Sequence, residues 1–224
     1  MANELISAIH VSPRYLHAAC AYEMYDLCNW VEIFARTALD QKGYIRPELP
    51  RDLGDFADLM AYYGEWRNGG HFGVAGNECD HDVYERAARL LHKIGQRDHA
   101  ANLTRFATFS NENSEHIDDL CEQGKEEVAY RLFDEFDDRF REIQNGSEPL
   151  ENALFSWLLE QSWIVADPEA PEFSMNYVYA SIPDHPEAKI RMEVAARERR
   201  AENAGASAAF LARLRDRLGR KDYG

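Results

Sequence analysis

The sequence predicts an all-α protein: a compact multi-helix domain with a basic helical C-terminal extension. Three observations lead to this class. Apolar residues recur at helical spacing over most of the chain, residues typical of helix ends separate these stretches, and strand-like alternation is limited to one short segment. The 224 residues, 45% hydrophobic and 12% aromatic, are also sufficient to bury a sizeable core.

Helix-end signals set the bounds in the first half of the chain. Ser12 is a hydroxyl N-cap, and Pro13 favours the first helical position. Asp80 or Asp82 can cap the third helix, and Gly95 supplies a left-handed residue after its end. The predicted helices cover residues 12–40, 52–67, 80–94 and 97–109, with a loop at 43–50 and an irregular segment at 71–79.

The second half is divided in the same way. Gly124 separates two helices, Asn145-Gly146 ends the second, and Pro149 opens another. Four prolines predict an extended linker over 166–186 with a short strand at 177–179. The predicted helices cover 113–122, 125–144, 149–163 and 187–218, and the predicted domains are an acidic domain (1–165), the linker (166–186) and a basic helical extension (187–224).

Three segments carry a family signature. They are Tyr62-Tyr63-Gly64-Glu65-Trp66-Arg67-Asn68-Gly69-Gly70-His71, then Lys93-Ile94-Gly95, then Leu132-Phe133-Asp134-Glu135-Phe136-Asp137-Asp138-Arg139-Phe140. Together they resemble the bacterial DNA-mimic protein family, over a core of about residues 50–145. The resemblance implies an acidic binding protein that occupies the DNA-binding face of another protein, in one branch as a dimer. The chain departs from the family pattern after the glycines, where His71-Phe72-Gly73 replaces the usual aromatic residue and glutamine.

The glycine-pair turn has two interpretations. In the structural one, Asn68 caps a helix end and Gly69 or Gly70 adopts a positive φ, as Gly95 does later in the chain. In the functional one, Glu65 and Asn68 contact a ligand. The spacing favours the structural role.

Charge excludes one class of function. The net charge is −15 and the pI is about 4.9, whereas binding nucleic acid directly requires clustered basic residues. The charge is uneven: residues 112–151 hold 14 acidic and 4 basic side chains, and residues 187–224 hold 6 and 10. An acidic segment of this kind favours a basic protein as partner, although solubility is the commoner reason for acidity.

The strongest candidate site is an acidic stripe on the helix predicted over 113–122. Its carboxylates lie at positions i, i+3, i+4 and i+7, so they share one face. The stripe consists of Glu115, Asp118, Asp119 and Glu122. The following helix adds Glu126 and a row of Asp134, Asp138 and Glu142. Its other face alternates Glu127, Arg131, Glu135 and Arg139, which predicts a ladder of ion pairs.

No motif for catalysis or for a cofactor occurs. The compact groups Cys79-Asp80-His81 and His92 to His99 lack the spacing of a zinc site, so no metal is expected. An enzyme stays an alternative if Glu65, His71 and His81 converge on one pocket. The cysteine spacing and the absence of a long apolar run predict a reduced, cytoplasmic protein without membrane contact.

These observations favour binding over catalysis. The leading hypothesis is a DNA-mimic-like protein that presents residues 112–142 to a regulator, nucleoid protein or nuclease, either alone or as a homodimer. The alternative is an immunity protein or antitoxin that neutralises a toxin through similar electrostatics. The basic extension has three possible roles: docking on its own core, docking across a dimer, or covering the acidic face.

Overall fold

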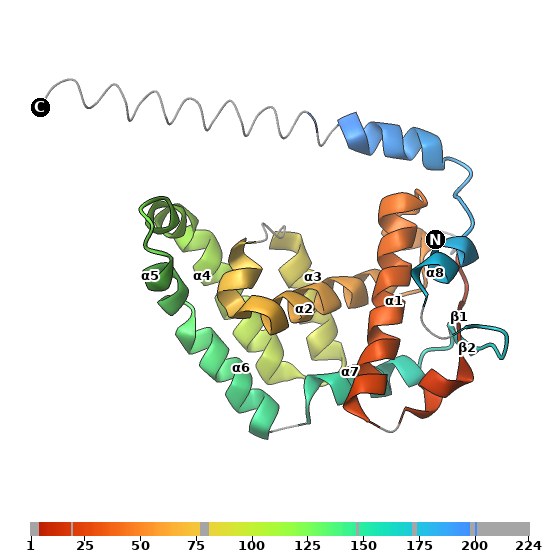
Figure 1. The fold of residues 1–224 in the computed structure, drawn as a ribbon, viewed down its shortest axis with the longest axis horizontal. Helices are drawn as coiled ribbons and strands as arrows, with labels where there is room; N and C mark the ends of the chain where they lie inside the picture. The colour runs from red at the N-terminus through yellow and green to blue at the C-terminus, as the bar shows by residue number, and fades with distance from the viewer. Residues whose placement is uncertain are drawn as a thin grey trace, which may run out of the picture.

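The computed structural model describes residues 5–18, 20–76, 81–146, 148–171, 174–197 and 200. These residues are predominantly helical, so the all-α prediction is confirmed. In Figure 1, α4, α5 and α6 lie on one side, α1, α8 and two short strands on the other, and α2 between them. The elements are β1 (Ile9–Val11), η1 (Pro13–His17), α1 (Ala21–Gln41), η2 (Arg46–Glu48), α2 (Leu53–Gly76), α3 (His81–Lys93), α4 (Arg97–Glu122), α5 (Glu126–Arg131), α6 (Asp134–Gly146), α7 (Leu150–Leu159), β2 (Ile164–Ala166) and α8 (Met175–Ser181). Residues 188–197 are also helical.

The core is built around α2, which contacts α1, α3 and α6. Apolar residues occur on all sides of α2, which is typical of a helix enclosed by others. Its Phe56 is fully buried and stacks on Trp157 of α7, with 5.7 Å between the ring centroids. From α1, Trp30 fills the opposite side of the core and is 1% exposed. Burial of these large aromatic side chains is a main source of the fold's stability.

Two predicted helices, 97–109 and 113–122, are one continuous helix, α4. Hydroxyl and amide side chains near residue 110 are of the types that favour helix ends, but here they do not end the helix. In the structure these side chains bond back to carbonyls four residues earlier, as Asn113 Nδ2 does to the Phe109 oxygen at 2.8 Å and Thr108 Oγ1 to the Thr104 oxygen at 3.0 Å. Such local bonding satisfies the side chains without interrupting the helix.

Three other predicted helices have different bounds. The first, predicted over 12–40, comprises η1, which ends at His17, and α1, which begins at Ala21; the Tyr15 ring of η1 lies 5.8 Å from the Trp30 ring of α1. The helix predicted over 125–144 divides into α5 and α6 at Phe133, which is fully buried against Phe106 and Phe109. The helix opened by Pro149 ends at Leu159.

The segment predicted to be irregular, 71–79, continues α2 to Gly76, and residues 77–80 lie outside the described part.

The strand predicted at 177–179 is wrong, because these residues belong to α8. Val178 is fully buried, and the Tyr177 ring lies 5.9 Å from that of Trp30 on α1. Two strands that the pattern did not predict do occur: β1 and β2 pair in parallel, with Ile9 opposite Ile164. A three-residue strand has too few positions to show alternation.

The chain after α8 is fixed to the loop that follows α1. Arg191 donates two hydrogen bonds to the Glu48 carboxylate, at 2.7 and 3.0 Å, and His185 donates its backbone N–H to the Lys42 oxygen at 2.9 Å. Lys42 in turn pairs with Asp184 at 2.9 Å. The predicted basic extension therefore starts from a firm anchor, and its residues 201–224 lie outside the described part.

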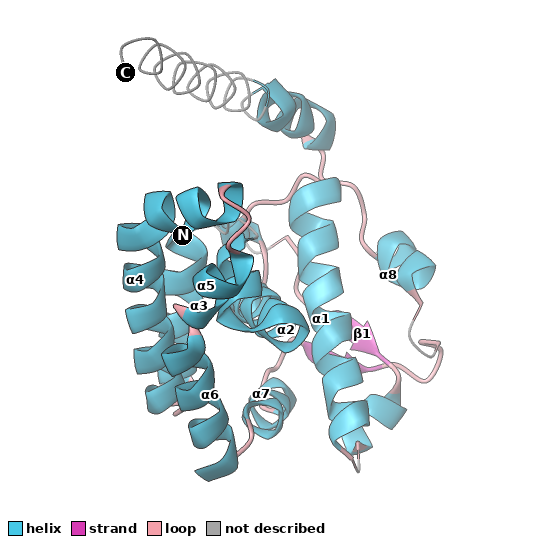
Figure 2. Ribbon diagram, turned by 60° about the vertical axis from the view of Figure 1, so that its left-hand side comes forward, coloured by secondary structure: helices cyan, strands magenta, loops and turns pink. Residues whose placement is uncertain are grey.

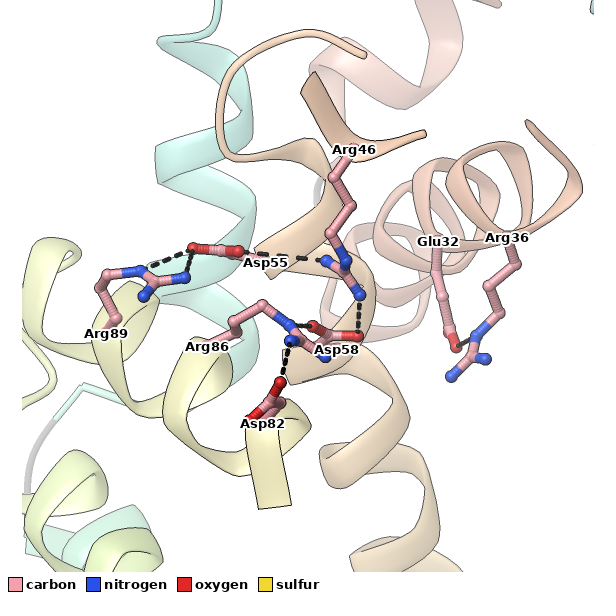
Figure 3. A network of polar contacts seen from close by, with 8 residues as sticks. All are labelled: Glu32, Arg36, Arg46, Asp55, Asp58, Asp82, Arg86 and Arg89. Carbon is pink, nitrogen blue, oxygen red and sulfur yellow. Dashed lines mark hydrogen bonds and ion pairs between the residues drawn. The ribbon is translucent and has the colours of Figure 1, made fainter. Parts of the chain in front are cut away.

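An ion-pair network joins η2, α2 and α3 (Figure 3). Asp58 of α2 is its centre: its carboxylate accepts from Arg46 at 2.8 Å and from Arg86 at 2.5 Å. Beside it, Asp55 pairs with Arg89 at 2.9 Å. The absence of a side chain at Gly54 makes room for Arg46, since a Cβ there would lie 2.6 Å from its Nη1.

Within the described residues, no helix is long and apolar enough to cross a membrane.

Candidate partner-binding surface

The acidic stripe lies on the second half of α4. All of its side chains are exposed, and Ile117 and Leu120 on the opposite side of the helix are each 8% exposed. The helical phase read from the sequence is therefore the phase observed. The remaining candidates are exposed as well: Glu126 on α5, and Asp134, Asp138 and Glu142 on α6.

The end of α4 concentrates negative charge. Its last turn contains no basic residue, and the carbonyl groups at a helix C-terminus already carry partial negative charge. Among the described residues, neither Glu115 nor Asp118 has an ion-pair partner. Gly124, with φ of 69°, then turns the chain directly into α5, which opens with Glu126 and Glu127.

On α6 the charges are partly neutralised. Arg141 pairs with Asp138 at 2.9 Å and Arg139 with Glu142 at 3.2 Å. The predicted ladder Glu127–Arg131–Glu135–Arg139 does not form in the described part of the chain. The break at Phe133 separates Arg131 from Glu135, and Glu135 pairs instead with Arg105 of α4.

α5 and α6 both contact α4. In Figures 1 and 2, α5 lies next to the end of α4. The stripe and the acidic residues of α5 therefore lie on neighbouring helices at one end of the molecule. We call these exposed carboxylates the acidic surface; they are Glu115, Asp118, Asp119, Glu122 and Glu126.

The glycine-pair turn is a kink inside α2. Gly70 has φ of 62° and ψ of −166°, a conformation available almost only to glycine, so the expected positive φ is present at Gly70. Gly95 also has a positive φ, 83°, as expected. At Gly70 there is a second constraint, because a Cβ would lie 2.5 Å from Oδ2 of Asp137.

Asp137 of α6 binds both arms of the kink. Its Oδ1 accepts hydrogen bonds from the Trp66 indole at 2.9 Å, from the His71 backbone N–H at 3.0 Å and from His71 Nδ1 at 2.7 Å. The hydroxyl of Tyr62 lies 3.0 Å from His71 Nε2. His71 is 0% exposed and Asp137 is 2% exposed, so this is an interior network.

The charge state of the network follows from its burial. Burial lowers the pKa of His71, and the hydrogen bond to Asp137 offsets this only in part. Burial alone would raise the pKa of Asp137, but the hydrogen bonds from His71 and Trp66 outweigh it and hold the pKa below its usual value. An ionised Asp137 therefore accepts from a neutral His71, and Tyr62 donates its hydroxyl proton to Nε2 of that ring.

Sequence reasoning missed Asp137 as a structural residue. The available signal was its position: Phe133, Phe136, Asp137 and Phe140 occupy one helical face, and the other three are apolar and buried. A lone carboxylate on such a face requires buried donors.

The other residues of the turn lie near the surface. Glu65 is half-buried and Asn68 is exposed. His71 is enclosed in the core, and the side chain of His81 lies outside the described residues, as does the convergence of Glu65, His71 and His81 on which the enzyme alternative depends. Within the described residues, no group of three or more His, Cys, Asp or Glu side chains is arranged to hold a metal ion.

The comparison with family models decides the relationship. Residues 47–161 match the model described as DMP19-like protein. The chain belongs to the DMP19-like protein family. This is the DNA-mimic family that the three signature segments indicated. The matched region contains α2 to α7, and with them the kink, its Asp137 anchor and the acidic surface. A search of curated proteins and a search of solved structures each find no significant match.

Proposed function

We propose that this chain is a non-catalytic binding protein whose acidic surface imitates DNA and occupies the basic, nucleic-acid-binding surface of another protein. The observation that carries the proposal is the end of α4. Acidic residues in a final helical turn typically cost about 0.3–1 kcal/mol each, because they oppose the helix dipole. Here Asp119 and Glu122 occur together with no basic residue in that turn, an arrangement that the helix dipole disfavours.

The spacing of the charges supports the same conclusion. Carboxylates at i, i+3 and i+4 advance by roughly 4.5–6 Å along a helix, and each DNA strand presents one phosphate per ~3.4 Å. A second acidic helix beside the first raises the charge density towards that of the duplex. The acidic residues at the start of α5 supply such a second row.

Family membership supports a binding role, since the DMP19-like family is not a known enzyme family. The partner that fits is a DNA-binding regulator, a nucleoid protein or a nuclease. A homodimer would present two acidic surfaces and so extend the length of duplex imitated.

The test uses two matched variants. The stripe variant carries Glu115→Gln, Asp118→Asn, Asp119→Asn and Glu122→Gln. The control variant makes the same change in charge at exposed residues elsewhere, with Asp40→Asn, Asp98→Asn, Glu160→Gln and Glu169→Gln. Each is immobilised, exposed to source-cell extract and washed with duplex DNA.

We expect the wild type and the control variant to retain DNA-binding proteins that duplex DNA displaces, and the stripe variant to lose them. Retention of the same proteins by all three would refute the role of the stripe. Retention of a toxin without nucleic-acid-binding activity, which DNA does not displace, would replace the proposal by the immunity-protein alternative.

A further inference from the structure

A cationic hollow lies beside the glycine-pair kink, and none of its lining residues belongs to the acidic surface. Its volume is about 430 Å³, and it is bounded by the kink of α2, by α5 and by α6. No carboxylate lines it, although the chain carries a net charge of −15. The lining residues are Trp66, Arg67, Asn68, Gly69, Gly70, Tyr130 and Arg141.

The Arg67 guanidinium packs against two tyrosine rings and is not paired with a carboxylate in the described part of the chain. Its guanidinium lies 4.5 Å from the centroid of the Tyr25 ring and 5.8 Å from that of Tyr63. Within the described residues it has no ion-pair partner, so its five N–H donors are not committed to a carboxylate. The second cation, Arg141, pairs only at the surface with Asp138, which is 72% exposed.

The helix cap predicted for Asn68 does not form in the described part of the chain, since α2 continues through it to Gly76. Asn68 is exposed, and its side chain makes no hydrogen bond to any described residue. Gly69 has φ of −149°, which other residues adopt, and a Cβ there would meet no atom within 4 Å. Gly70 is required by its backbone and by Asp137, whereas Gly69 only keeps the floor of the hollow open.

We propose that this hollow binds a carboxylate on a peptide segment of another protein. Guanidinium groups match the planar carboxylate, and the amide of Asn68 offers further donors. The buried charge of Asp137 is already satisfied by three donors and does not line the hollow.

A second hollow of about 360 Å³ adjoins the first. It is lined by Phe72, Glu126, Glu127, Tyr130 and Arg131, so its two rings offer contact to a neighbouring side chain of the peptide and its two carboxylates disfavour an acidic one. This neighbour favours a peptide carboxylate over a free ion.

The experiment is an NMR titration of the full chain, observing the amide signals of Gly69 and Gly70 and the indole signal of Trp66. Four probes are used: acetate, inorganic phosphate, acetyl-Glu-Leu-amide and acetyl-Gln-Leu-amide. We expect the Glu peptide to shift these signals at lower concentration than acetate does, and the Gln peptide to have no effect. Phosphate binding more tightly than the Glu peptide, or no shift with either anion, would overturn the proposal.

Variants separate binding from folding. Arg67→Gln and Gly69→Ala are each expected to weaken binding of the Glu peptide by about tenfold or more, while leaving the protein folded with nearly the same thermal midpoint. Arg139→Gln removes an exposed arginine of α6 that does not line the hollow, and should bind as the wild type does. Equal binding by all three variants would overturn the assignment of the site.

Discussion

Replacing Gly70 with alanine should lower the free energy of unfolding far more than the same change at Gly69. The conformation of Gly70, φ of 62° with ψ of −166°, costs other residues about 1–3 kcal/mol. The new Cβ would also lie 2.5 Å from Oδ2 of Asp137, so the carboxylate must move. Weakening its hydrogen bonds to Trp66 and His71 adds about 1.5–3 kcal/mol for a charged acceptor. We expect a total loss of about 2.5–6 kcal/mol in the free energy of unfolding.

The assay is urea unfolding at pH 7 followed by circular dichroism. Gly69→Ala is the matched control, because the φ of Gly69 is not left-handed and its Cβ would meet no atom within 4 Å; we expect a change below about 1 kcal/mol. If Gly70→Ala lies within about 0.5 kcal/mol of this control, the kink is not held by Asp137 and the structural argument is wrong.

Three further predictions concern stability. Burial lowers the pKa of His99 to about 4, so the free energy of unfolding should fall as pH drops below about 6.5. In urea unfolding, the wild type should lose about 2 kcal/mol more than His99→Leu between pH 7 and pH 5. Equal losses in the two proteins would contradict this prediction. Asp58→Ala leaves Arg46 and Arg86 without their shared carboxylate and should lower the free energy of unfolding by about 2 kcal/mol in the same assay. Asp82→Ala, at an exposed site, should lower it by less than about 0.5 kcal/mol. The stripe variant should be about 0.5–2 kcal/mol more stable than the wild type, because its carboxylates oppose the dipole of α4; a loss of stability would show that they serve the fold.

The sequence predicted features that depend on local chemistry. The exposure of the stripe followed from helical phase, and the positive φ of a residue in the glycine pair followed from turn chemistry. Features that depend on distant residues were missed. The pairing of Ile9 with Ile164 joins residues far apart in the chain, and the break at Phe133 arises because its ring enters a core made by α4.

The same division applies to the functional sites. The acidic residues could be named from one helix at a time. The cationic hollow could not, because Arg67 and Arg141 lie on different helices and meet only when Asp137 holds α6 against the kink. The family signature thus links residues whose proximity is a property of the fold.

The central claim is that the acidic surface binds a basic protein by imitating DNA. The most direct measurement is the dissociation constant of the captured partner as a function of salt concentration, for the wild type, the stripe variant and the control variant. We predict that the affinity of the wild type and of the control variant falls steeply as salt is added, because unscreened charge supplies the attraction. The stripe variant should bind more weakly, and its affinity should depend less on salt. An identical affinity and salt dependence for all three proteins would contradict the claim.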